Sequence, residues 1–362
     1  MVIITGCKDE FNLELKSSDE TLLVVEGILI AGQGPTNIRL TQTMDLNNPV
    51  QIQPVLQAVL SVESLAGDVY PLMETGNGYY THNQLPLTVG EEYRLRIVTG
   101  GKEYLSDYVE VRVSPEIDSV TWKRTPDGLF IYANAHDVTN GTRYYKWDFD
   151  ETWEIRSYYT AFYQYISGTT IIPTPGPYNY RCWKYASSNT INIASTAQLE
   201  SDVLSEAVVH FIPFGSERLN YRYSILLRQQ SLTKAAYQYF QLMKKNTESI
   251  GTIFDPQPSE LKGNIHCITD PQEGVIGFLT ASTINEKRIF ITAQEANWNF
   301  EQACPSVEVP NHPDSIKNFV PSYLPYSARE LAPGVIEAYH MAPAFCVDCT
   351  KRGGDLNMPS YW

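Results

Sequence analysis

Short runs in which apolar and polar residues alternate recur through the chain, and this period of two constrains its fold more than any other feature. In the clearest run Tyr93, Leu95 and Ile97 alternate with charged residues, just before the Gly100-Gly101 pair. Side chains of a β-strand point alternately to opposite faces, so such a run buries one face and leaves the other in water. The 24 tyrosines also favour strands, because aromatic residues fit the half-buried surface of a sheet. We therefore expect a mainly β protein.

Turn and proline signals divide the chain into four segments. Residues 1–20 hold too few large apolar groups to pack, so we expect a lipobox remnant and an acidic tether. Ser114-Pro115 closes the first set of strands, because proline cannot donate into a central ladder. Residues 21–114 are therefore predicted to form an immunoglobulin-like or transthyretin-like β-sandwich, and residues 115–302 a second, fibronectin-like domain. The proline-containing residues 303–362 are predicted to form an irregular segment packed on the body.

One segment has helical periodicity. Leu232, Ala236 and Met243 recur at helical spacing, and Ser231 can cap the start. We expect one clear α-helix over residues 231–249.

The charge balance excludes one class of partner. Acidic residues outnumber basic ones by 41 to 27, which gives a net charge of -14 and repels phosphate backbones. No run approaches the roughly 20 apolar residues of a membrane-spanning helix. We expect no nucleic-acid partner, and contact with a membrane only through a lipid anchor.

The first ten residues indicate the cellular location of the protein. An apolar run ends in Thr5-Gly6-Cys7, which is similar to a bacterial lipobox, in which the cysteine thiol is alkylated by a diacylglyceryl group. Because a secretory h-region needs about 7–15 residues, we expect the true start to lie upstream of Met1. Lys8, Asp9 and Glu10 follow, and resemble the acidic export signal of Bacteroidota surface lipoproteins. Several acyl chains, at about 0.8 kcal/mol per buried methylene, would make this attachment effectively permanent.

Five further cysteines predict disulfides, which are the default state in an exported protein: Cys182, Cys267, Cys304, Cys346 and Cys349. We expect Cys304 to pair with one of the last two, Cys182 to pair with Cys267, and one thiol to remain free. An alternative is a zinc site, in which the Cys-x-x-Cys pair is joined by Cys304 and His340. We favour the disulfides, and expect no metal and no other cofactor.

Four acidic residues lie close together in an aromatic segment: Asp148, Asp150, Glu151 and Glu154. Grouped carboxylates can serve glycoside hydrolysis or calcium binding. A calcium loop needs a glycine for its sharp turn, however, and a glycosidase pair usually comes from separate strands. We therefore interpret the four residues as the solvated face of one strand. The chain has no Gly-x-Ser-x-Gly elbow and its six histidines are scattered, so we predict no catalytic residue.

Longer stretches at residues 23–27, 144–154, 223–229 and 245–265 match the pattern of a known family. With the lipobox, they resemble the Bacteroidota outer-membrane lipoproteins of domain-of-unknown-function family 4249. The resemblance implies a lipoprotein found with a TonB-dependent receptor-like barrel, and it carries over no catalytic residues. We therefore expect a non-catalytic accessory or binding subunit of such a barrel, anchored in the outer membrane and exposed at the cell surface. The alternatives are a surface hydrolase of glycans or peptides and a structural adhesion module.

Overall fold

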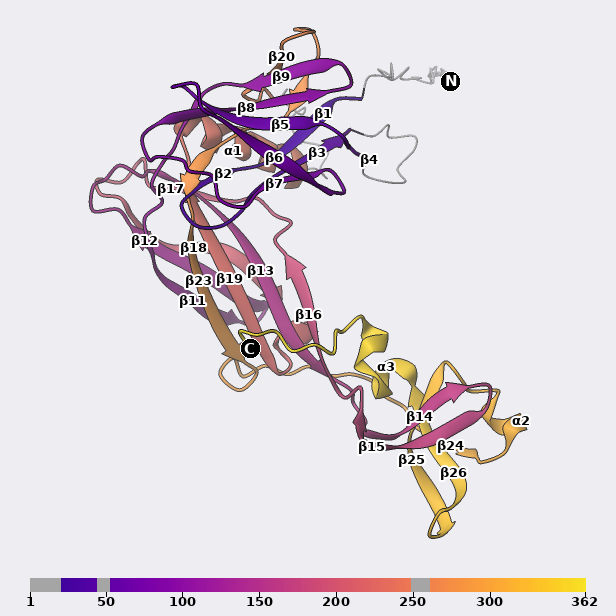
Figure 1. Cartoon of the computed structure of the whole chain (residues 1–362). Helices are drawn as coiled ribbons and strands as arrows, with labels where there is room; N and C mark the ends of the chain where they lie inside the picture. Colours follow the sequence, from indigo (N-terminus) through magenta and orange to yellow (C-terminus); the bar gives the residue numbers. More distant parts are fainter. Residues whose placement is uncertain (1–20, 44–52, 249–260) are drawn as a thin grey trace, which may run out of the picture. The chain divides into compact units, whose positions relative to one another are not determined.

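A computed structural model describes residues 21–43, 53–248 and 261–362, and these fold mainly as β-strands (Figure 1). The predicted mainly β class is therefore confirmed. Within the described residues, no helix combines the length and the apolar character needed to cross a membrane.

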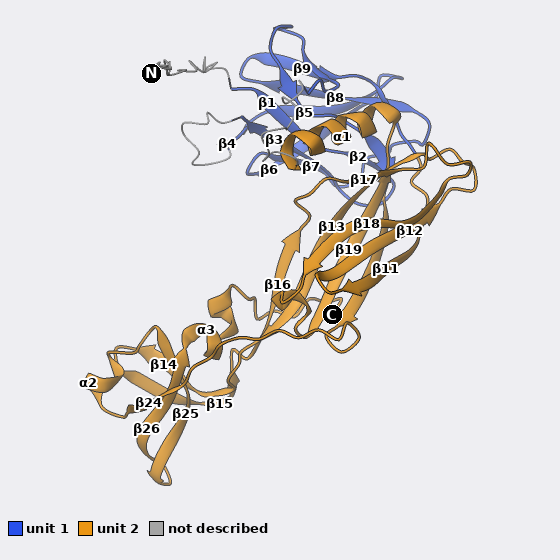
Figure 2. Cartoon of the chain, turned by 180° about the vertical axis from the view of Figure 1, so that it is seen from behind, with its two compact units in different colours: residues 1–112, 251–283 blue, residues 113–250, 284–362 orange. Residues whose placement is uncertain are grey.

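The chain forms two compact units (Figure 2). Unit 1 combines residues 1–112 with 251–283, and unit 2 combines residues 113–250 with 284–362. The first boundary lies close to the one predicted at Ser114. The second unit is interrupted, however, because part of the predicted domain 115–302 belongs to unit 1.

Unit 1 is a β-sandwich with one apolar core. Its hydrogen-bonded strands follow the order β20-β9-β8-β5-β6-β7-β3-β1-β21. Residues of β1 and β3 share a single buried cluster with residues of β5 and β8, so the two ends of this path face each other across the core. The strands of unit 1 are β1 (Leu23–Gly27), β2 (Leu29–Ala31), β3 (Thr36–Gln42), β4 (Gln53–Pro54), β5 (Val59–Ser64), β6 (Val69–Gly76), β7 (Tyr79–His82), β8 (Glu92–Thr99), β9 (Lys102–Ser106), β10 (Val109–Glu110), β20 (Ile265–Cys267), β21 (Val275–Ile276) and β22 (Ala281–Thr283).

Strand β8 buries Tyr93, Leu95 and Ile97, as the alternation predicts. The Gly100-Gly101 turn joins it to β9, which the sequence reading did not identify. Strand β8 also pairs with the short strand β10.

Residues 261–283 return to unit 1 after the chain has passed through unit 2. Here β21 pairs in parallel with β1, β22 pairs in parallel with β2, and β20 pairs antiparallel with β9. Parallel neighbours need a long connection, which unit 2 supplies. The segment also buries Ile265 and Leu279 in the core of unit 1, and this explains why it leaves the predicted second domain.

Unit 2 is built on a two-sheet sandwich. Three strands, β11 (Ile117–Thr125), β12 (Gly128–His136) and β18 (Val203–Pro213), form one sheet, and the second has the order β16-β13-β19-β23, with β17 beside β13. Three strands packed against four in this order are the arrangement of a fibronectin type III sandwich, so the predicted fibronectin-like domain is confirmed. The second sheet and its neighbours are β13 (Tyr144–Arg156), β16 (Arg181–Ser187), β17 (Asn192–Ser195), β19 (Arg222–Ser231), β23 (Asn285–Thr292), the short helix η1 (Glu217–Leu219) and α1 (Lys234–Glu248), which is the predicted helix.

A smaller part of unit 2, called the lobe below, holds most of the residues from 303 to 352, after which the chain returns to the sandwich (Figure 1). The prediction of an irregular segment 303–362 is wrong, because this region forms a three-stranded sheet in the order β24-β26-β25. Its prolines lie at positions where the pairing of strands requires no backbone N–H donor. Pro310 and Pro343 end strands, and Pro325 lies at a register shift. The lobe consists of β14 (Ala161–Ser167), β15 (Thr170–Tyr178), β24 (Val307–Pro310), β25 (Tyr323–Ala332), β26 (Val335–Pro343), α2 (Pro313–Ile316), α3 (Ala344–Val347) and η2 (Cys349–Arg352).

A glycine makes the return of residues 261–283 sterically feasible. Gly277 has a φ of +154°, and a Cβ there would lie 2.5 Å from the carbonyl oxygen of Val25. We expect Gly277→Ala to lower the free energy of unfolding of unit 1 by about 2–4 kcal/mol, measured by chemical denaturation. Gly34→Ala is the matched control, because Gly34 has a φ of +110° but no atom within 4 Å of its Cβ position, so only backbone strain of about 1–2 kcal/mol applies. Equal losses would contradict the close approach.

Candidate functional site

The predicted lipidation and export residues lie outside the described residues: Cys7, Lys8, Asp9 and Glu10. The other candidates that the sequence suggested are among the described residues: the acidic group, the five later cysteines and His340.

The acidic group of β13 is not one solvated face. Tyr145, Trp147 and Phe149 are buried in the sandwich core, and the same alternation continues inward to Glu151, which is 2% exposed. Glu154 lies on the outward face, yet it is only 1% exposed. The interpretation as a solvated face is therefore wrong for these two glutamates.

Glu151 is the centre of a buried ion-pair network. Its carboxylate lies 2.9 Å from Nε of Arg218 and 3.2 Å from Nε2 of His210, and it accepts a hydrogen bond of 3.0 Å from the Tyr223 hydroxyl. Burial raises the pKa of Glu151, but the hydrogen bond and charge of His210 and the charge of Arg218 outweigh this, so its pKa lies below the usual value.

The other three carboxylates are also engaged by cations. Glu154 lies 2.6 Å from both Nε of Arg156 and Nη2 of Arg181. Asp148 and Asp150 are half-exposed. Asp148 forms an ion pair with Lys146, and Asp150 forms one with Arg228. No cluster of three or more His, Cys, Asp or Glu side chains that could hold a metal ion occurs among the described residues. The four carboxylates therefore act as ion-pair partners, and those of Asp150, Glu151 and Glu154 join β13 to other elements of the sandwich.

Replacing Glu151 by glutamine should destabilise unit 2, because Arg218 and His210 lose their anionic partner. We expect a loss of about 3–5 kcal/mol at pH 7 in chemical denaturation. Since the folded pKa of Glu151 lies below its ordinary 4.5, the contribution of the carboxylate is complete above pH 4.5 and disappears as the pH falls through the folded pKa. The difference between wild type and variant should therefore shrink in acid.

Asp148→Asn is the matched control for this experiment. Asp148 is 46% exposed and its ion pair with Lys146 is screened by solvent, so its loss should remove less than about 1 kcal/mol at any pH. A difference for Glu151→Gln that stayed constant down to pH 2 would contradict the proposed origin of the effect.

Two disulfides hold the lobe, and they correct one predicted pairing. Cys304 pairs with Cys346, one of the two partners predicted for it. Cys182 pairs with Cys349, so the predicted bond to Cys267 is wrong, and Cys267 is a buried free thiol in unit 1. The zinc alternative is also wrong, because all three of its cysteines are oxidised. Its fourth candidate, His340, lies on β26 with its ring near Tyr326.

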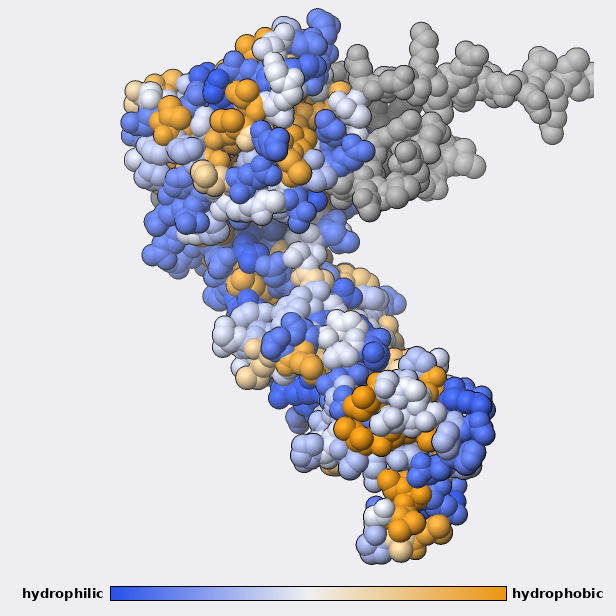
Figure 3. Space-filling model, turned by 45° about the vertical axis from the view of Figure 1, so that its right-hand side comes forward, coloured by the Kyte–Doolittle hydropathy of each residue, from blue (hydrophilic) through white to orange (hydrophobic). Residues whose placement is uncertain are grey.

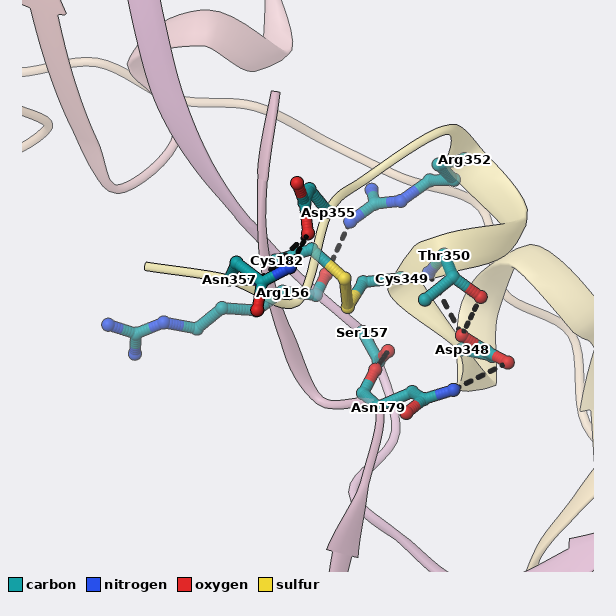
Figure 4. Close-up of a disulfide and its surroundings, with 10 residues drawn as sticks. All are labelled: Arg156, Ser157, Asn179, Cys182, Asp348, Cys349, Thr350, Arg352, Asp355 and Asn357. Carbon is teal, nitrogen blue, oxygen red and sulfur yellow. Dashed lines mark hydrogen bonds between the residues drawn. A yellow bond between two sulfur atoms is a disulfide. The ribbon is translucent and has the colours of Figure 1, made fainter. Parts of the chain in front are cut away.

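Polar contacts surround the Cys182–Cys349 bond and fix the chain on either side of it (Figure 4). Asp348 accepts hydrogen bonds from the backbone N–H of Thr350 at 2.9 Å and from Nδ2 of Asn179 at 3.1 Å. Farther along, the backbones of Asp355 and Trp183 exchange two hydrogen bonds of 2.8 Å. The end of the chain is therefore attached to β16 and to the turn before it.

The lobe exposes apolar side chains. Figure 3 shows hydrophobic residues gathered on its surface. At the tip of the β25–β26 hairpin, Leu331 is 69% exposed and Val335 is 52% exposed. Exposed apolar side chains that gather on a surface can mark an interaction site. The apolar surface of the lobe includes six side chains: Phe162, Ile166, Ile172, Leu331, Val335 and Phe345.

Sequence reading missed this surface, although one signal was present. Pro333-Gly334 separates two apolar runs, which is a turn signal between two strands. The many prolines of residues 303–362 concealed it, because they were interpreted as breaking every strand.

The disulfide attached to β16 should contribute strongly to the stability of unit 2. Cys182 and Cys349 are 167 residues apart, and in the chain-entropy account a cross-link that closes a long loop restricts the unfolded chain substantially. We expect the double variant Cys182→Ser, Cys349→Ser to lose about 2–5 kcal/mol in chemical denaturation and to be cleaved faster in the lobe by proteases. Cys267→Ala is the control, because it removes a buried thiol without a cross-link. Unchanged stability of the double variant would contradict the pairing.

The fold and the lobe define the class of this protein: a chain of two β units, of which the second is a fibronectin type III-like sandwich with an added disulfide-linked lobe. The profile of the family described as domain of unknown function (DUF4249) matches residues 8–288, well over half of the chain, and the protein belongs to this family. No curated protein matches it. Among solved structures, a two-domain fibronectin type III segment of chicken tenascin is similar, at 10% sequence identity and a TM-score of 0.18, over 58% of this chain and 91% of that one.

Proposed function

We propose that this protein is an exported, lipid-anchored binding subunit that docks on a TonB-dependent barrel of the outer membrane and catalyses no reaction. The observation that carries the proposal is the lobe, in which two disulfides hold an exposed apolar surface in place. Barrel docking and cell-surface exposure also rest on the family resemblance and on the export signal after Cys7.

The disulfides support an extracytoplasmic location. Cys182, Cys346 and Cys349 are fully buried, and their bonds close loops within one unit. Structural disulfides of this kind persist in oxidising compartments and are rare in the reducing cytosol. The lipobox-like residues before Cys7 support attachment to a membrane on that side.

The lobe supports a role in assembly. Leu331 and Val335 protrude at a hairpin tip, and Arg329 and Glu330 precede them as charged neighbours. An apolar centre with a polar margin is the usual composition of a protein interface. We therefore assign the contact with the barrel to this surface.

The acidic group supports a non-catalytic role. Catalytic carboxylates need a pKa near the working pH and access to substrate. Glu151 is instead held ionised in the sandwich core, and Glu154 is enclosed by two arginines. A hydrolase and an adhesion module are the other functions considered, and no contact of these residues favours either.

Cross-linking in outer membranes tests the assignment. Full-length protein, expressed in its native cell, should capture a TonB-dependent barrel after cross-linking and pull-down. The double variant Leu331→Asp, Val335→Asp should reduce this capture at least tenfold, because charges would replace the apolar contact. Val138→Asp is the matched control, because Val138 is 84% exposed in unit 2 but lies outside the lobe. Absence of any barrel in the wild-type capture would refute the function, and equal capture by both variants would refute the surface.

A further inference from the structure

The lobe contains a cavity of about 220 Å³. One wall is the β14–β15 hairpin, with Tyr163 and Tyr165 on β14 and Tyr178 at the end of β15. The floor and the opposite wall include Leu324 and Val347, which are buried. The cavity is therefore formed by two stretches that are far apart in the sequence.

The disulfides determine the shape of this cavity. Val347 and Asp348 line it, and they stand between Cys346 and Cys349, whose partners lie on different segments. Asp348 is held from the other side by Asn179, the residue that follows Tyr178. A site whose walls are fixed in this way loses little conformational entropy when it binds a ligand.

Size and lining limit the ligand. Sites for drug-sized ligands measure roughly 300–1,000 Å³, so this cavity suits a single small ring. Tyrosine rings offer an apolar face together with a polar tip, which matches a molecule with C–H faces and hydroxyl edges. The hydroxyls of Tyr163, Tyr165 and Tyr178 make no hydrogen bond to any residue within the described ranges, so they are available to such a ligand.

The charges of the lining favour a neutral ligand. Asp348 and Lys351 are its charged members, and their formal charges cancel. The Asp348 carboxylate already accepts hydrogen bonds from Thr350 and Asn179.

We propose that this cavity binds one neutral hexopyranose ring, either as a free sugar or as the terminal residue of a glycan. The ring would lie against the tyrosine side chains, and its hydroxyls would exchange hydrogen bonds with the tyrosine hydroxyls. The site goes beyond the proposed function, because it requires no barrel and gives the lobe a ligand of its own.

Titration of the purified full-length protein tests the site. D-Glucose, D-galactose and D-mannose, and a trisaccharide of each, are added while binding is followed by saturation-transfer NMR and calorimetry. We expect saturable binding of at least one sugar with a Kd of about 1 mM, because a ligand with so few atoms makes few contacts and binds weakly. Binding of both sizes assigns the site to a single ring, and binding of the trisaccharide alone assigns it to the end of a glycan.

Conservative variants locate the binding. Tyr165→Phe and Tyr178→Phe each remove one hydroxyl and preserve the ring, so each should weaken binding about three- to tenfold without a change in Tm. Tyr79→Phe is the control, because Tyr79 is 40% exposed and belongs to unit 1, whereas the lobe is part of unit 2.

Three results would overturn the proposal. They are no saturable binding of any sugar up to tens of millimolar, equal binding by cyclohexanol, and tighter binding of D-glucuronate than of D-glucose. Capture of the barrel by cross-linking is a separate measurement, so failure of sugar binding would leave the proposed function standing, and the reverse also holds.

Discussion

The bond between Cys182 and Cys349 is the constraint on which the lobe depends. It joins β16 of the sandwich to the short helix η2, 167 residues later. Because the bond fixes both ends, Asp348 can hydrogen-bond to Asn179, and the backbone of Asp355 can pair with that of Trp183. The apolar surface and the cavity are both built from segments that this bond holds together. The lobe has two small apolar clusters and no single large core, and a small structure of this kind gains most from such a cross-link.

Strand β13 connects the parts of the sandwich, as the Cys182–Cys349 bond connects the parts of the lobe. It hydrogen-bonds to β16, β17 and β19, and its inward face carries Trp147, whose Nε1 donates to Gln229 across the sheet at 3.0 Å. The same face then places Glu151 in the core, where the ion pairs with Arg218 and His210 and the hydrogen bond from Tyr223 make a buried carboxylate tolerable. Its outward face ends in Glu154, which is covered by two arginines. The acidic group therefore contributes to structure on both faces.

The sequence was sufficient to predict buried strand faces, because these follow from local alternation. It was not sufficient to predict which distant strands and cysteines pair. Tyr93, Leu95 and Ile97 were placed on a buried face, because period two is sufficient for this, and the same period runs through the buried Tyr145, Trp147 and Phe149. Continuing that period by one more step would have buried Glu151 as well. The parallel pairing of β21 with β1 and the partner of Cys182 were not predictable, because neither leaves a local signal. The sheet of residues 303–362 was hidden by prolines that in fact stand at strand ends and at a bulge.

The additions to the sandwich explain why a fibronectin-like fold alone identifies no function. Two of the additions to its seven strands lie together in unit 2: the hairpin β14–β15 between β13 and β16, and the segment that follows β23. These two additions pack together to make the lobe, with Tyr163 of the hairpin in edge contact with Tyr339 of the segment. Sandwich strands are constrained by their core, whereas added segments are free to acquire binding residues. Since neither addition encloses the cavity alone, a ligand there would stabilise the junction of the two as well as bind to it.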